Sequence, residues 1–178
     1  MQNFKIKLER KLQRKLENKI PPPIVMVLFA LLMWAIAQIT DTTGITSSTA
    51  PTIATDSSLS WLQLMAIILL LALGVLCAIA GVISFNRAKT TVHPLKPETA
   101  SALVTSGIYR FSRNPMYLGM ALALCAWACY LASMWSVVGI VGFILYMQRF
   151  QIAPEERALE VIFGQTFIDY KKRVRPWI

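Results

Sequence analysis

The chain has 178 residues, of which 56 % are hydrophobic and 15 % are charged, and its mean hydropathy is +0.54. Charged residues make up roughly a quarter of an ordinary soluble domain, so this composition argues against a soluble fold and favours a bilayer as the main solvent. The net charge of +9 does not indicate nucleic-acid binding, because the Lys and Arg residues lie in three blocks beside hydrophobic runs, without interleaved aromatic side chains that would stack on bases.

The first block predicts an amphipathic helix. Within residues 4–20 an apolar side chain recurs every fourth position, and Lys and Arg fill most of the remainder. Such a helix lies in the membrane interface with its basic face toward the head groups; a solvated basic tail is the alternative. The three prolines at 21–23 end it, since proline inside a helix removes a donor and clashes with the preceding turn. We therefore assign residues 1–22 to a basic interfacial helix.

Four apolar segments follow, and each predicts a transmembrane helix: residues 24–40, 62–85, 115–133 and 134–152. The first is not expected to be a cleaved signal peptide, because a long basic segment precedes it and no clear small-residue cleavage site follows. Almost nothing separates the last two, which predicts a tight helical hairpin.

Small residues form a stripe on the second of these helices. Gly74, Ala78 and Gly81 recur at helical spacing, and small residues allow two membrane helices to approach closely. We expect this stripe to pack against another helix, and it leaves a homodimer open.

The distribution of charge predicts the topology. The loop at 41–60 contains no Lys or Arg, whereas the N-terminal segment, the 86–114 loop and the C-terminal segment from residue 148 hold all 18. Four spans with both termini in the cytoplasm place every basic block on the cytoplasmic side. We predict an all-α integral membrane protein with four transmembrane helices, an N-terminal amphipathic helix and a C-terminal cytoplasmic helical segment. The short connections favour a bacterial inner membrane.

Polar residues that could carry chemistry collect in two segments, 105–119 and 148–178. In the first, Asn114 is a good N-cap and Pro115 suits the first helical turn, while Arg113 could be a snorkelling anchor at the cytoplasmic surface.

In the second segment, Pro154 could open a helix whose dipole Glu155 and Glu156 complement. Paired carboxylates at a bilayer surface are nevertheless costly without a cationic partner. Four tyrosines are expected in the same layer, and acidic groups with aromatic faces suit a positively charged ligand. These are Tyr109, Tyr117, Tyr146 and Tyr170.

A metal site is not expected. Cys125 and Cys129 share a helix face, but no His or carboxylate cluster accompanies them. With Cys77 they lie in hydrophobic runs, where a thiol packs as a small apolar group.

The two polar segments together resemble the isoprenylcysteine carboxyl methyltransferase family. The motifs are LVTSGIYRFSRNPMYLG, beginning at Leu103, and EERALEVIFGQTFIDYKKRV, beginning at Glu155. The similarity covers residues 87–178, about half the chain. It implies a helical membrane bundle that binds S-adenosylmethionine, with a cytoplasmic C-terminal segment that closes over this cofactor. We therefore divide the rest of the chain into two transmembrane helices, 23–85, and a methyltransferase core, 86–178.

The resemblance also implies roles for single residues. Glu155 would hold the amino group of the donor, and Arg113, Arg149 and Glu156 are the expected catalytic residues. The remaining expected cofactor contacts are Leu103, Val104, Tyr109, Asn114, Pro115, Met116 and Tyr117.

Two positions depart from the family pattern. Asn114 stands where isoprenylcysteine enzymes usually have His. Gln151 stands where they have a substrate-binding Arg, and Arg149 is the nearest arginine. Because a carboxylate substrate favours a bidentate arginine, this departure leaves a carboxylate, an amine or a thiol as possible acceptors. An amine must lose a proton, for which Glu156 and His93 are the candidate bases.

The sequence thus predicts a membrane S-adenosylmethionine-dependent methyltransferase whose partner is a lipophilic small molecule or lipid rather than nucleic acid. One alternative is an NADPH enzyme resembling sterol reductases, which share a similar RxPxYxG signature. The other is a membrane scaffold that keeps the fold without catalysis.

Overall fold

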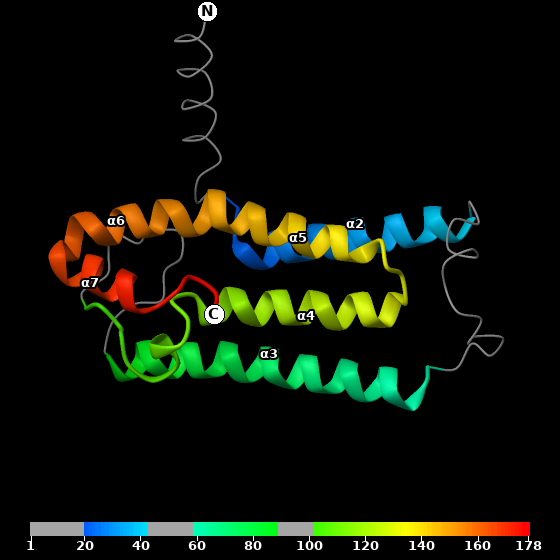
Figure 1. Cartoon of the computed structure of the whole chain (residues 1–178), viewed down its shortest axis with the longest axis horizontal. Coiled ribbons are helices and arrows are strands. Elements are labelled where there is room, and N and C mark those ends of the chain that lie inside the picture. The colour runs from blue at the N-terminus through cyan, green and yellow to red at the C-terminus, as the bar shows by residue number, and fades with distance from the viewer. Residues whose placement is uncertain (1–19, 43–58, 89–101) are drawn as a thin grey trace, which may run out of the picture.

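The computed structural model describes residues 20–42, 59–88 and 102–178, and within these ranges the regular secondary structure is all helical, with no strand. The helices lie lengthwise beside one another, with α3 along α4 and α2 along α5 (Figure 1). The elements in chain order are α2 (Pro22–Thr42), α3 (Trp61–Arg87), the 3₁₀ helix η2 (Gly107–Arg110), α4 (Pro115–Leu131), α5 (Ser136–Met147), the π-helical turn η3 (Gln148–Ile152), α6 (Ala153–Phe163) and α7 (Gln165–Arg173).

Among the described residues, three helical segments are long and apolar enough to cross a membrane: Pro22–Thr40, Trp61–Arg87 and Ser136–Phe163. Large apolar side chains are exposed along much of α2 and α3, as expected of helices that face lipid rather than water. The prediction of an all-helical integral membrane protein is confirmed. α4 is apolar but has only 17 residues, so the four-span count and the orientation of the termini stay predictions. The predicted interfacial helix at 1–22 lies almost wholly outside the described residues.

The small-residue stripe packs inside the bundle. A Cβ atom on Gly119 of α4 would lie 2.6 Å from the carbonyl oxygen of Gly74, and one on Gly81 would lie 2.9 Å from Cγ of Met116. The backbones of α3 and α4 are therefore in direct contact, which confirms the expected helix packing. Because α4 covers the stripe, it offers no surface to a second copy, and a homodimer stays a prediction.

The tight hairpin is also confirmed. α4 ends at Leu131, Ala132 takes a left-handed conformation (φ 50°), and α5 begins at Ser136. At the other end of α4, Pro115 is the first helical residue and Asn114 the N-cap, although the Asn114 side chain makes no capping hydrogen bond.

The C-terminal segment differs from the sequence interpretation. Pro154 does not open a helix, because α5, η3 and α6 form one continuous helical segment. The π-helical turn just before Pro154 changes the hydrogen-bond register where proline offers no N–H. The predicted C-terminal helix is instead two helices, since Gly164 (φ 51°, ψ −127°) ends α6 and α7 begins at Gln165.

Candidate functional site

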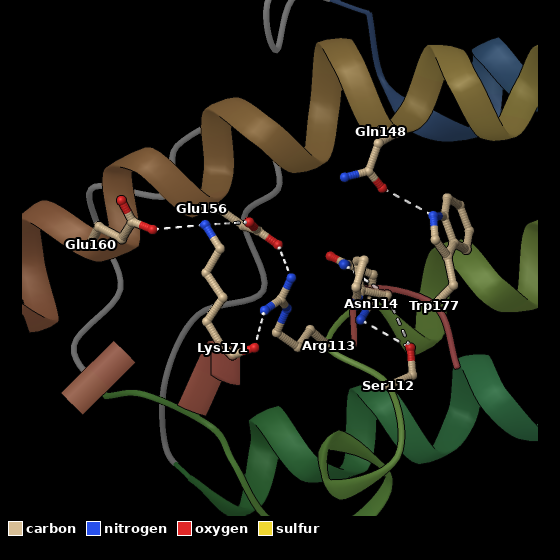
Figure 2. Close-up of polar contacts among 9 residues, drawn as sticks. Ser112, Arg113, Asn114, Gln148, Glu156, Glu160, Lys171 and Trp177 are labelled. Atoms are coloured by element: carbon tan, nitrogen blue, oxygen red, sulfur yellow. Dashed lines mark hydrogen bonds and ion pairs between the residues drawn. The ribbon is translucent and has the colours of Figure 1, made fainter. Parts of the chain in front are cut away.

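The polar site lies at the end of the bundle where α6, α7, the turn at 112–114 and the C-terminal tail come together (Figure 2). The contacts of Arg113 with Glu156 and of Asn114 with Pro176 join residues 43 and 62 positions apart in the chain. The turn at 112–114 makes contacts with α6, with α7 and with the C-terminal tail.

Arg113 is the centre of an ion-pair cluster. Its Nη2 lies 2.6 Å from Oε1 of Glu156, and the two side chains are only 8 % and 13 % exposed. Its Nη1 donates to the carbonyl oxygen of Lys171 at 3.0 Å. The Lys171 ammonium in turn lies 3.1 Å from Oε2 of Glu156 and 2.8 Å from Glu160. The interpretation of Arg113 as a surface anchor is therefore wrong, since it connects the 112–114 turn to α6 and α7.

We expect this pair to contribute measurably to stability. Removing one partner of a buried ion pair leaves an uncompensated charge, which typically costs about 3–5 kcal/mol. The single variants Arg113→Met and Glu156→Gln should each destabilise the protein, and the double variant should lose less than the sum of the two. Thermal unfolding in detergent of the wild type and the three variants measures this coupling. Additive losses would mean that the two side chains do not interact.

Glu155 has a different surrounding. The Tyr117 hydroxyl, on a residue that is 6 % exposed, donates to Oε1 of Glu155 at 2.5 Å. Among the described residues, no Lys or Arg nitrogen lies within ion-pair distance of Glu155. Glu156, the next residue, is paired with two cations, so the carboxylate pair divides into one member that connects α6 to Arg113 and Lys171 and one that has no cationic partner among the described residues.

Two further tyrosines stabilise the wall of the site. The Tyr170 hydroxyl donates to the carbonyl oxygen of Tyr109 at 2.7 Å, and the Tyr109 ring packs edge-on against Phe85 at 5.3 Å. Burial raises the pKa of Tyr170 to about 12, despite the opposing effect of Arg113, and burial also raises the pKa of Tyr109. Both hydroxyls therefore stay protonated at neutral pH and remain hydrogen-bond donors.

The C-terminal tail closes against the 112–114 turn. The side-chain amide nitrogen of Asn114 donates to the carbonyl oxygen of Pro176 at 3.0 Å, and the Ser112 hydroxyl donates to the same oxygen at 3.3 Å. The indole N–H of Trp177 donates to Oε1 of Gln148 at 3.0 Å (Figure 2). Sequence reasoning missed these contacts, and the signal that could have indicated them is the tryptophan in an otherwise polar C-terminus.

The other expected site residues are distributed as follows. Pro115 and Val104 are buried, Leu103 and Met116 are partly buried, and Met116 packs on Gly81. Arg149 is exposed on η3, whereas Gln151, on the same turn, is fully buried. His93 lies outside the described residues. Within the described ranges no group of three or more His, Cys, Asp and Glu is arranged to hold a metal ion.

Fold and site together define an all-helical membrane protein with a tyrosine-lined acidic site at one end of its bundle. The model of the phospholipid methyltransferase family matches residues 62–166, more than half of the chain. The chain therefore belongs to this family, which also confirms the resemblance to isoprenylcysteine methyltransferases.

Similar curated proteins agree with this assignment. The chain is 30 % identical to the rat protein-S-isoprenylcysteine O-methyltransferase over 129 residues, which cover 67 % of this chain and 45 % of that protein. It is 26 % identical to protein-S-isoprenylcysteine O-methyltransferase B of Arabidopsis thaliana over 108 residues, 59 % of this chain and 53 % of that protein. An uncharacterized protein of Haemophilus influenzae is 43 % identical over 63 residues, which are 35 % of this chain and all of that protein. The chain thus spans about half the length of the isoprenylcysteine enzymes it matches, and no solved structure matches it significantly.

Proposed function

We propose that the chain is an S-adenosylmethionine-dependent methyltransferase that modifies a lipophilic acceptor reaching the site from the bilayer. The observation that carries this proposal is the Glu155 carboxylate, which is hydrogen-bonded by Tyr117 and has no cationic partner among the described residues. An unpaired carboxylate at a membrane surface is costly unless a cation joins it, and the α-ammonium group of the donor is such a cation.

The residues around Glu155 fit a donor of this kind. Tyr117 fixes the orientation of the carboxylate through a charge-assisted hydrogen bond. Tyr109 and Tyr117 offer aromatic faces to a positively charged sulfonium by cation–π attraction. Leu103, Val104, Pro115 and Met116 would supply apolar contacts to the adenosyl part, while Asn114 holds the tail that closes the site.

A bound donor supplies an electrophilic methyl carbon. A lone pair of the acceptor forms the new bond to that carbon, and the broken carbon–sulfur bond leaves its electron pair on sulfur as a neutral thioether. An amine or thiol acceptor also releases one proton, to Glu156 or to water. Holding the reacting atoms in contact accounts for about 7–11 kcal/mol of barrier lowering in well-oriented reactions. Arg113 and Arg149 would assist by orienting Glu156 and the acceptor head group.

An apolar groove provides room for the acceptor's hydrocarbon chain. It has a volume of about 490 Å³ and is lined by residues of α2 and α4. Its wall includes Trp34 and Trp127, and the indole N–H of Trp127 is satisfied by the carbonyl of Ala30 at 3.0 Å. A wall without free polar groups suits an aliphatic chain.

We also propose a membrane topology. Four spans with both termini in the cytoplasm place the site at the cytoplasmic surface, where the water-soluble donor is available. The division into an interfacial helix at 1–22, two spans at 23–85 and a methyltransferase core at 86–178 follows from this arrangement.

Binding measurements on detergent-purified protein test the proposal. We expect saturable calorimetric binding of S-adenosylmethionine and S-adenosylhomocysteine, and none of NADPH. Binding of NADPH alone would favour the reductase-like alternative, whereas binding of none of the three would favour a scaffold.

A further inference from the structure

Gln151 is the one buried side chain in η3 whose polar atoms are only half satisfied. The residue is 0 % exposed, and its amide nitrogen donates to the carbonyl oxygen of Ile20 at 2.8 Å. Its amide oxygen has no hydrogen-bond partner within the described part of the chain. Buried polar atoms in native proteins are nearly always paired, and an orphaned acceptor is destabilising until a donor reaches it.

The location of this oxygen connects it to the site. Gln151 belongs to a π-helical turn, a feature that occurs frequently at functional sites. Glu155 lies four residues later in the same continuous helical segment, which is about 6 Å along the axis. A methyl acceptor held next to a methyl donor bound at Glu155 would therefore be within reach of Gln151.

The apolar groove begins near the same end of the bundle. Its first residue on α2 is Met26, six positions after Ile20, and its first on α4 is Ala123, six positions after Tyr117. Six helical residues span about 9 Å on α4, Ile20 lies just before the start of α2, and α2 and α4 both run away from the polar end of the bundle (Figure 1). The Gln151–Ile20 and Tyr117–Glu155 contacts thus lie at the same end of the groove, where the head group of a lipid in it would sit.

The chemistry of the amide oxygen limits which head group can bind. A carbonyl oxygen only accepts hydrogen bonds and carries the negative end of the amide dipole. An ionised carboxylate has no hydrogen to donate and would meet that negative end, while Gln151 brings no positive charge to compensate.

We infer that Gln151 is a specificity-determining residue whose free amide oxygen accepts a hydrogen bond from an N–H or O–H group of the molecule that is methylated. That molecule therefore has a hydrocarbon chain and a head group that can donate a hydrogen bond, and the head group is not a carboxylate. This inference rests on the proposed function and names the acceptor class for the same site.

The test uses three probes that share a twelve-carbon chain and differ in the head group: dodecanamide, N,N-dimethyldodecanamide and dodecanoate. Their binding to the detergent-purified protein is measured by calorimetry with S-adenosylhomocysteine present. Because only dodecanamide carries an N–H, we expect it to bind at least about tenfold more tightly than either of the other two. Equal affinities, or a preference for dodecanoate, would overturn the inference even where S-adenosylhomocysteine binds normally and the proposed function stands.

Two variants separate Gln151 from a general effect of the fold. Gln151→Leu should bring the ratio of dodecanamide to N,N-dimethyldodecanamide affinity close to one. Gln63→Leu is the matched control, since Gln63 also donates its side-chain amide to a distant backbone carbonyl, that of Cys129 at 2.6 Å, at the opposite end of α4. This variant should keep the full ratio. A ratio that survives in Gln151→Leu would assign the discrimination to another residue. If the wild type itself does not bind S-adenosylhomocysteine, the proposed function is refuted, and the inference with it.

Discussion

Replacing Glu155 with glutamine is expected to weaken the binding of S-adenosylmethionine and S-adenosylhomocysteine by roughly 30-fold or more, because loss of one partner from a desolvated charge pair costs about 2–5 kcal/mol. The fold should survive, since the glutamine carbonyl can still accept the hydrogen bond that Tyr117 donates to Glu155. Calorimetry of both ligands, with circular dichroism as a check on folding, measures the change.

Glu160→Gln is the matched control for this prediction. It makes the same substitution on the same helix, but Glu160 pairs with Lys171 at 2.8 Å and is more exposed. Donor affinity should change less than about threefold in this variant, as for exposed ion pairs in general. A Glu155→Gln protein that binds both ligands like the wild type would show that the ammonium group of the donor is held elsewhere.

The difference between Glu155 and Glu156 marks the limit of what the sequence could predict here. In the sequence alone, Glu155 and Glu156 are an acidic pair that follows a proline. On a helix, however, consecutive side chains point about 100° apart, so Glu156 reaches Arg113 while Glu155 reaches Tyr117. Which member would be neutralised depends on where the 112–114 turn and α7 lie, and no periodic pattern in the sequence specifies that.

Other features followed directly from local patterns. The apolar runs, the hairpin around Ala132 and the contact of Gly74 with α4 were all predictable, because each depends on hydrophobicity or on spacing along one helix. The continuous segment through Pro154 was not, since a π-helical turn has no recognisable composition. Contacts of the tail, such as that of Ser112 with Pro176, join residues 64 positions apart and depend on the complete fold.

The second large effect is expected at the contact between α3 and α4. A Cβ atom on Gly119 would lie 2.6 Å from the backbone carbonyl oxygen of Gly74, and a backbone atom cannot move aside as the end of a side chain can. Gly119→Ala must therefore separate the two helices. Overpacking of this kind typically costs about 1–3 kcal/mol, which exceeds the gain in helix propensity of up to about 1 kcal/mol.

Gly142→Ala supplies the comparison, because the same substitution there meets the edge of the Phe29 ring at 2.9 Å, a side-chain atom that can rotate away. Unfolding in detergent, followed by circular dichroism, should show a lower midpoint for Gly119→Ala and a nearly unchanged one for Gly142→Ala. Donor affinity should fall as well in Gly119→Ala, since α4 carries Tyr117 less than one turn away and a tilt of this helix moves the hydroxyl from Glu155. If Gly119→Ala were as stable as the wild type, the backbones of α3 and α4 would not be in direct contact at Gly119.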